Sequence, residues 1–505
     1  MRRSAVTTMT MLLTMNSMFL VARTASAQLS GSNLFEFQAG NLPFAEPADL
    51  TTGYDQLNLM YREGDIVGAV RVEAFQTPES DHEYTSLSQY RLTYRTRRTE
   101  LNVGHFYDIL GRGLLLRAYE IPGVVFEDIA SRVRRGFYRD VRGVSMRYSG
   151  DRVSAGLVRG RPLSNVLAPT INERERRPDL IEAADIGLRI GGVTVGGQFL
   201  RNNTERASTN FASLSVSSFV SSVSGYVEYA RSLDDGIGIA DFGDDSRYAA
   251  YASIAYARGA FGLSVEGKDY HNFFLGSGFN DPPSLVREQS YVVLNRSTHV
   301  LNVIDERGLQ LEGYHTSGGM TLTANATIAE NKFDRRYLFR ELFLELVARI
   351  DRDASLKLFA DAAEDAFRLE RKRLSAGGYV SAALNPSWST SVGVEGQRFS
   401  RSGDVLAGGV TNFVVSVSLD YIARYSVGIT AERTDDPFLT DNPTTTEFEA
   451  GARYWFGVTG SWRPTSHHTA AVFAGRRRGG PACTSGICYE VLDFNGVEVR
   501  LTSRF

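Results

Sequence analysis

Apolar and polar residues alternate along much of the chain in segments of about ten residues. Between Asn412 and Tyr421, apolar side chains occupy 413, 415, 417, 419 and 421, while the positions between them are mostly Asn, Ser and Asp. This period of two predicts strands with one apolar and one polar face, and helical spacing does not fit it. The same alternation recurs at 320–328, 341–349, 425–432 and 447–454.

The final segment of the chain shows the pattern most clearly. Val497, Val499 and Leu501 alternate with charged or hydroxyl residues, and the chain stops at Phe505. Because the second face is largely charged, this strand does not suit the packed core of a soluble sandwich. An amphipathic strand that ends on an aromatic residue is typical of the assembly signal of bacterial outer-membrane barrels. It predicts contact with membrane lipid and, during biogenesis, with the barrel-assembly machinery.

The turn signals predict an all-β fold, a transmembrane antiparallel β-barrel of about 22 strands, within a range of about 20–24. A first strand near 32–39 and the last strand complete the set that the turns join. The Ser-rich stretch 210–232 is either one long loop segment or an extra hairpin, and a hairpin would make the count about 24. The ten short turns fall near Gly64, Thr96, Gly150, Gly191, Gly259, Gly318, Asp353, Pro386, Ala423 and Pro464.

Short turns are expected at the periplasmic side and long connections at the extracellular side. A barrel of this size has a backbone radius of roughly 20 Å, so side chains alone cannot fill it and it either conducts or is occluded by loops. The expected long connections are 41–53, 78–83, 108–140, 161–180, 202–246, 271–306, 331–336, 364–370, 400–410, 435–446 and 478–489.

The N-terminal residues read as a signal peptide, with Arg2 and Arg3 before an apolar stretch and Ala25-Ser26-Ala27 as a cleavage site. Residues 1–27 are therefore excluded from the fold, and 28–505 is expected to be one barrel domain in the outer membrane. The signal carries three arginines and no acidic residue, so the formal net charge of −3 becomes −6, which gives no bias toward nucleic acid. No later apolar run is long enough for a transmembrane helix.

The connection 108–140 combines apolar and charged residues in a way that a solvent-exposed loop does not require. Leu114, Leu115 and Leu116 are flanked by charged positions. One hypothesis is that the segment folds into the lumen and forms a pore constriction, whose charges set a transverse field. The alternative is that the charges pair with lumenal carboxylates and fix the loop structurally. The candidate residues are Asp108, Arg112, Arg117, Glu120, Glu127, Asp128, Arg132, Arg134, Arg135 and Arg139.

Cys483 and Cys488, the only cysteines, are separated by four residues near the C-terminus. In an exported protein such a pair predicts a local disulfide, with free thiols as the alternative. Metal binding is not expected because two thiols lack nearby ligands. Neither G-x-S-x-G nor H-E-x-x-H occurs, so we expect no enzymatic activity and no cofactor.

Two passages resemble an uncharacterised family of exported bacterial proteins whose domain has no known function. The first is GHFYDILGRGLLLRAYE at 104–120, and the second is GRRRGGPACTSGICYEV at 475–491 together with GVEVRLTSRF at 496–505. The resemblance implies a porin-like outer-membrane barrel and no assigned reaction.

The sequence thus predicts a porin-like channel for diffusion of small polar or charged solutes. The alternative is a plugged structural or partner-binding barrel of an envelope or secretion complex. A TonB-dependent transporter is disfavoured because the first strand pattern begins within about ten residues of the cleavage site, too few for a plug domain.

Overall fold

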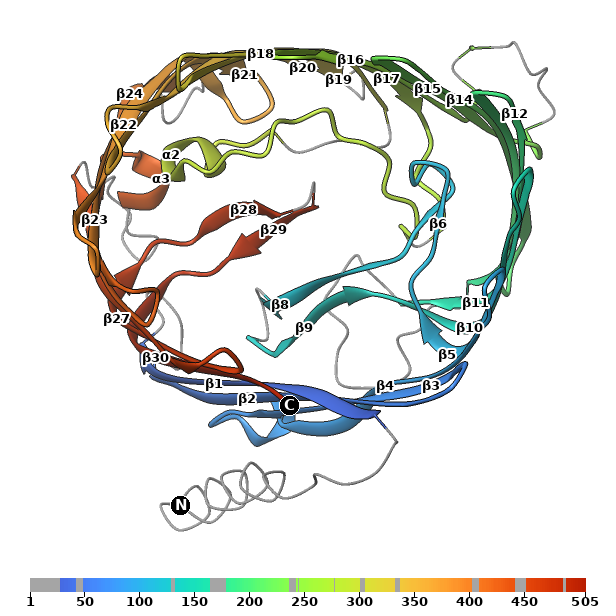
Figure 1. The fold of residues 1–505 in the computed structure, drawn as a ribbon, viewed down its shortest axis with the longest axis horizontal. Coiled ribbons are helices and arrows are strands. Elements are labelled where there is room, and N and C mark those ends of the chain that lie inside the picture. Colours follow the sequence, from blue (N-terminus) through green and yellow to red (C-terminus); the bar gives the residue numbers. More distant parts are fainter. Residues whose placement is uncertain are drawn as a thin grey trace.

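The chain forms a closed antiparallel β-barrel of 24 strands, shown down its axis in Figure 1. The all-β barrel prediction is therefore confirmed. No helix among the described residues is long and apolar enough to cross a membrane. The computed structural model describes residues 28–41, 49–128, 132–163, 179–235, 242–243, 245–276, 278–299, 305–331, 337–401, 408–440, 451–484 and 487–505. The predicted signal peptide at 1–27 lies outside these residues.

Each wall strand pairs with the next wall strand along the chain, and this holds across the insertions as well. The first twelve are β1 (Gln28–Asn41), β2 (Asp49–Glu63), β3 (Ile66–Gln76), β4 (Tyr84–Arg95), β5 (Thr99–Phe106), β10 (Val141–Ser149), β11 (Val153–Pro162), β12 (Leu180–Ile190), β13 (Val193–Asn203), β14 (Ser208–Val220), β15 (Val223–Ser232) and β16 (Tyr248–Arg258). The other twelve are β17 (Phe261–His271), β18 (Asp305–Ser317), β19 (Met320–Asn331), β20 (Tyr337–Arg349), β21 (Ala354–Asp365), β22 (Glu370–Asn385), β23 (Trp388–Arg401), β24 (Gly408–Tyr421), β25 (Tyr425–Thr434), β26 (Arg453–Thr465), β27 (His468–Arg477) and β30 (Phe494–Arg504).

Three insertions interrupt this order, after β5, β17 and β27, and Figure 1 shows them within the ring of strands. Two of them contain short hairpins, and the third contains a single helical turn. A second helical turn lies between β25 and β26, and a 3₁₀ turn lies between β3 and β4. These elements are β6 (Ile109–Leu110), β7 (Leu116–Arg117), β8 (Tyr119–Glu127), β9 (Arg134–Arg139), β28 (Gly480–Thr484), β29 (Ile487–Val491), α2 (Val292–Asn295), α3 (Pro437–Thr440) and η2 (Ser80–His82).

The count of 24 lies within the expected range of 20–24 and matches the alternative with an extra hairpin in 210–232. β14 and β15 pair from Phe211↔Ser232 to Val220↔Val223, so they meet at a tight turn. At this turn Ser221 has a positive φ of 55°. Serine is not one of the residues that usually mark such a conformation, so turn chemistry gave no signal there.

The alternation of apolar and polar side chains divides the outer surface from the inside of the barrel. On β14, Leu214 is 70% exposed on the outer face, while Ser213 and Ser215 are buried on the inner face. A closed barrel with an apolar exterior satisfies all backbone groups within a membrane, since no strand edge remains open. The protein is therefore an integral barrel of the bacterial outer membrane.

The first and last strands close the cylinder. Phe35 lies opposite Leu501, as the closing strand predicts. Beyond the ladder, the Gly31 N–H donates to the Phe505 carbonyl at 2.7 Å, and the Phe505 N–H donates to the Gly31 carbonyl at 3.0 Å. The C-terminal aromatic residue is thus part of the seam. Its role as an assembly signal, with Val497 and Val499, stays a prediction.

Replacing Gly31 by valine is expected to lower the yield of folded barrel several-fold. A Cβ at this position would lie 2.5 Å from the Phe505 ring and 2.8 Å from the Asn58 carbonyl oxygen, so the closing residue would have to move. Heat-modifiable migration on gels measures the folded fraction. Gly68→Val is the matched control because a Cβ at Gly68 has no neighbour within 4 Å. Equal yields of the two variants would show that close packing of the Phe505 ring against Gly31 is not needed for folding.

Candidate functional site

The segment between β5 and β10 forms two hairpins inside the barrel (Figure 1). The first, β6–β7, carries Leu114, Leu115 and Leu116, which are fully buried. They belong to one apolar cluster with inward-facing wall residues such as Ile181 and Phe211. Full burial of a leucine side chain contributes about 1.5–3 kcal/mol, so these three residues fix the hairpin to the wall.

The second hairpin, β8–β9, is anchored by a buried carboxylate on β3. Glu73 accepts hydrogen bonds from the Gly136 N–H at 2.7 Å, the Tyr138 hydroxyl at 3.0 Å and the Tyr54 hydroxyl at 2.6 Å. A carboxylate with three donors is well satisfied in a buried position. This contact fixes one strand of the hairpin against the inner face of the wall.

Ion pairs add to this anchor and involve three of the predicted residues. Glu120 pairs with Arg71 of the wall at 2.5 Å. Arg134 is buried between Glu36 of the wall at 2.9 Å and Glu127 of its own hairpin at 3.8 Å. Removing one partner of such a buried pair is strongly unfavourable, because it leaves the other charge uncompensated.

The other predicted residues also have partners within the barrel. Asp128 lies in the hairpin turn, where its N–H donates to the Val133 carbonyl at 3.0 Å. The remaining contacts are an Asp108–Arg147 ion pair, the Arg112 guanidinium 4.9 Å from the Tyr226 ring centre, an Arg117–Asp281 ion pair at 3.1 Å, an Arg132–Glu127 ion pair at 2.8 Å, Arg135 at 5.3 Å from the Phe126 ring centre, and Arg139 at 5.2 Å from the Tyr119 ring centre.

The structure thus places the ten residues in the lumen, where most of them form ion pairs with other residues of the barrel. This geometry favours the structural alternative for Glu120 and Arg134, which tie the hairpin to the wall. Arg135 differs, because it is buried against aromatic rings and burial lowers its pKa. A role of the hairpin as a pore constriction remains a proposal.

The connection 271–306 was expected outside the cell. The described residues between its two strands, 272–276 and 278–299, instead follow the inner wall (Figure 1). The first N–H groups of α2, at Val292 and Val293, donate to the Glu395 carboxylate of β23 at 3.1 and 2.9 Å. The carboxylate is well placed there because helix N-termini carry unpaired donors and a partial positive charge. Tyr291 stacks on Phe359 with 3.8 Å between ring centres.

Charged residues hold both ends of this insertion. Lys268 of β17 pairs with Glu306 of β18 at 2.5 Å and donates to the Ser284 carbonyl. His299 lies 2.9 Å from Asp365 and 3.4 Å from Glu306. Burial lowers the pKa of His299, but the two carboxylates outweigh burial and raise the net pKa above its usual value. The apolar residues between Phe273 and Leu294 are the sequence signal that could have predicted the inward position of this stretch.

A cavity of about 580 Å³ lies on the side of the lumen formed by β25, β26, β27 and β30. Its lining follows β25 from Ser426 to Glu432, about 20 Å along the tilted strand, which corresponds to about 15 Å across the membrane. Five arginines and two glutamates contribute to the lining, together with aromatic residues. These charged residues are Arg296, Arg476, Arg477, Arg478, Arg500, Glu432 and Glu498.

Four of these arginines form ion pairs with carboxylates, and two of the four share one carboxylate. Arg296 and Arg478 both bind Glu432, each at 2.7 Å. Arg477 pairs with Glu498 at 3.3 Å, and Arg500 pairs with Glu36. Burial lowers the pKa of Arg296 to about 10 although Glu432 opposes the change, and Arg478 adds to the lowering. Two guanidinium groups thus share one carboxylate, and the lining as a whole carries five arginines and two glutamates.

The hairpin β28–β29 aligns the two cysteines directly, with Cys483 opposite Cys488 in the backbone register. Directly opposed residues in an antiparallel pair lie about 4.5–5.5 Å apart at Cα, within the range that a disulfide spans. The cysteine side chains lie outside the described part, so the disulfide stays a prediction. Within the described residues, no group of three His, Cys, Asp or Glu side chains is arranged to hold a metal ion.

Comparison with known proteins gives a family of unknown function and a fold. Residues 1–121 match the model of a family of unknown function (DUF6029), so the resemblance is confirmed over the first of the two passages. No curated protein matches the chain.

Similar solved structures are outer-membrane barrels, at very low identity. The translocation pore of the P pilus usher PapC is 10% identical, with a TM-score of 0.47 over 94% of this chain and 99% of that chain. OccD3 (OpdP) of Pseudomonas aeruginosa is 11% identical, with a TM-score of 0.39 over 68% and 88% of the two chains. A mutant of the ferric enterobactin receptor PfeA of P. aeruginosa is 9% identical, with a TM-score of 0.48 over 96% and 81%.

Proposed function

We propose that the protein is a porin-like channel through which small anionic solutes diffuse along the arginine-lined side of the lumen. The observation that carries the proposal is the basic cavity beside β25–β27, whose lining follows β25 from Ser426 to Glu432. The insertion after β5 packs through its apolar cluster against β11–β17. The insertion after β17 packs through α2 against β20, β21 and β24, and its residues Val292 and Arg296 form one side of the basic cavity. The proposed path runs through this cavity, between α2 and the wall strands β25–β27.

The lining supports selection by charge. Arginine side chains in a narrow lumen attract carboxylate and phosphate groups and repel cations, because field lines concentrate where water is limited. Guanidinium groups bind these planar or tetrahedral anions through two parallel hydrogen bonds. Only four of the 55 basic residues are lysine, which agrees with such a lining.

A second candidate is a plugged barrel that binds a partner of the cell envelope. It is favoured by the extent of the lumenal apolar cluster, in which β6–β7 and the segment 273–285 cover the inner face of β11–β17. Inward-facing apolar side chains such as Leu200 and Phe211 make these insertions part of a fixed core.

Planar-bilayer recording of the mature protein tests the two candidates. The channel proposal predicts single-channel currents with reversal potentials that show preference for anions. A protein that is folded by heat-modifiable migration but silent in the bilayer would contradict the channel and support the plugged barrel. Co-purification of a stable envelope partner with the silent protein would identify its role.

The double variant Arg296→Gln with Arg478→Gln is expected to lower the anion-to-cation permeability ratio by about tenfold or to reverse it. Both arginines bind Glu432, so their removal leaves a carboxylate without its cations in the cavity. Reversal potentials in a salt gradient measure the ratio. Arg398→Gln is the matched control, because Arg398 is exposed on the outer face of β23. An unchanged ratio in the double variant would exclude this cavity as the selective path.

A further inference from the structure

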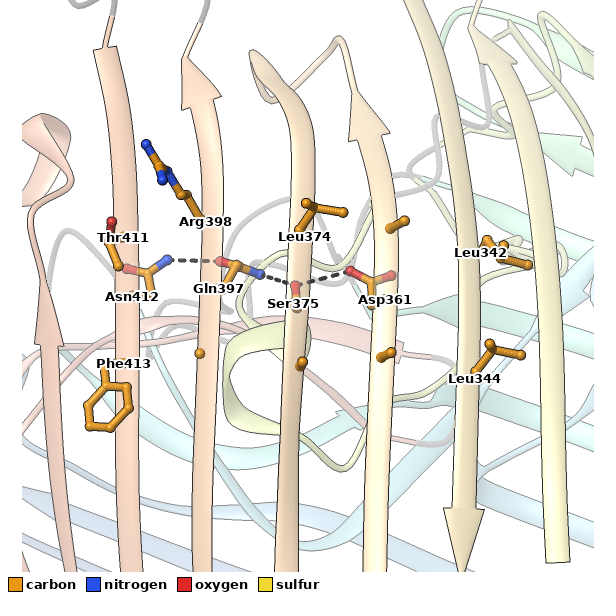
Figure 2. A pocket seen from close by; sticks show the side chains of 14 residues that line it. Leu342, Leu344, Asp361, Leu374, Ser375, Gln397, Arg398, Thr411, Asn412 and Phe413 are labelled. Carbon is orange, nitrogen blue, oxygen red and sulfur yellow. Dashed lines mark hydrogen bonds between the residues drawn. The ribbon is translucent and has the colours of Figure 1, made fainter.

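A shallow groove lies on the outer face of the barrel across β20 to β24 (Figure 2). It has a volume of about 520 Å³. One transverse row of outward positions makes its floor, because the register places small residues side by side on three adjacent strands. The row runs Leu344, Ala360, Ala376, Gly396 and Phe413, and consecutive members are direct cross-strand partners.

The hollow is fixed in shape by the wall behind it. On the inner face of the same strands, Asn412 donates to Gln397 at 2.8 Å, Gln397 donates to Ser375 at 3.2 Å, and Ser375 donates to Asp361 at 3.1 Å (Figure 2). This chain of hydrogen bonds crosses four strands. Leu344 and Phe413 bound the hollow on its two sides, so the outer surface offers an apolar trough where neighbouring sectors carry large side chains.

Basic side chains gather at the extracellular end of the trough. Arg398 lies on the row above Gly396, in register with Leu374. The pairing of β22 with β23 shifts between Arg371 and Leu374, which leaves Arg371 and Lys372 both exposed. Within the part of the chain that the structure describes, none of these three cations has an ion-pair partner.

The end of the trough that carries these cations faces the outer leaflet. β22 and β23 meet at a tight turn after Asn385, and that turn is periplasmic because outer-membrane barrels carry their short turns on the periplasmic side and their long loops on the other. The cations lie at the opposite end of the strands, at the level where lipid head groups meet the membrane surface. Arginine and lysine at that level attract anionic head groups.

We propose that this groove binds one phosphorylated lipid of the outer leaflet, with an acyl chain in the trough and a phosphate held by Arg398, Arg371 and Lys372. The small residues make room for the chain, and two guanidinium groups and an ammonium match the charge and geometry of phosphate. An apolar hollow next to unpaired cations complements an acylated phosphate, and a neutral lipid would leave the cations without partners. The site is independent of any transport through the lumen.

Native mass spectrometry of the purified mature barrel tests this site. The probes are an acylated diglucosamine lipid with phosphates and the same lipid after removal of the phosphates, each added from mixed micelles. The expected result is one tightly held phosphorylated lipid per barrel and about tenfold less retention of the dephosphorylated form. Equal retention of the two lipids would overturn the proposal.

Two variants separate the head-group contacts from the acyl trough. Arg398→Gln combined with Arg371→Gln and Lys372→Gln should abolish the preference for phosphate. Gly396→Leu should reduce retention of the phosphorylated lipid about tenfold by filling the trough, and a Cβ at Gly396 has no neighbour within 4 Å, so the side chain fits.

Gly197→Leu is the matched control, because Gly197 lies between the outward-facing Ile186 and Leu214 on another sector of the wall. It should leave retention unchanged. If the leucine at 396 prevents folding, Ala376→Leu fills the same trough. Loss of retention in the triple variant but not in either trough variant would show surface attraction alone and overturn the assignment of the groove.

Discussion

Replacing Arg373 by methionine is expected to lower the free energy of unfolding by about 3–5 kcal/mol. The Arg373 side chain of β22 is almost completely buried and binds three carboxylates. These are Glu341 at 3.0 Å, Glu370 at 3.1 Å and Asp361 at 3.3 Å. The guanidinium also donates to the Ser297 carbonyl at 2.8 Å. Without it, three acidic groups remain buried without their shared cation, and the insertion that contains α2 loses an anchor.

Arg189→Met is the control for this prediction. Arg189 of β12 is exposed, and its replacement should change the free energy of unfolding by no more than about 0.5 kcal/mol. Urea titration in detergent, followed by tryptophan fluorescence and by heat-modifiable migration, measures both variants. If the Arg373 variant unfolds at the same urea concentration as the Arg189 variant, the cluster does not stabilise the barrel.

The wall of the barrel could be predicted from the sequence because each strand has to separate lipid from the interior. Leu342 and Leu344 face outward where alternation predicts them, and the ten expected short turns all occur. The extra hairpin was harder to predict because serine occupies both strand positions, at Ser213 and Ser215, and the turn, at Ser221. The residue type therefore does not distinguish strand from turn or loop there. A two-residue alternation with weak contrast between its two faces specifies strand register poorly.

The interior could be predicted only where apolar residues interrupt a loop. Leu114–Leu116 gave that signal for the first insertion. For the second insertion, the turn residues Asp281-Pro282-Pro283 led to the prediction of an extracellular loop, which was wrong. Glu395, which binds the N–H groups of α2 in the second insertion, lies about a hundred residues further along the chain. Only the register of β23 brings this carboxylate next to α2. The basic cavity and the outer groove depend on register in the same way, since their residues come from four or more strands.

Excision of the β8–β9 hairpin is expected to raise single-channel conductance by about twofold or more, since we propose that the hairpin forms a constriction of the lumen. Tyr119 and Arg139 are direct cross-strand partners, so their Cα atoms are about 5 Å apart and an Asn-Gly turn can replace residues 120–138. The first hairpin keeps Leu114–Leu116 in the apolar cluster. The shortened protein should therefore still fold.

A tip-shortened variant separates removal of the hairpin from the effect of cutting the chain. Replacing residues 128–133 by Asn-Gly keeps the pairs Glu127↔Arg134 and Phe126↔Arg135, so the body of the hairpin stays in the lumen and conductance should stay near that of the full chain. A folded protein without 120–138 that conducts no better than this variant would exclude the hairpin as a constriction. Its ion pairs with Glu36 and Arg71 would then act only to stabilise the barrel, as the buried geometry of Arg134 allows.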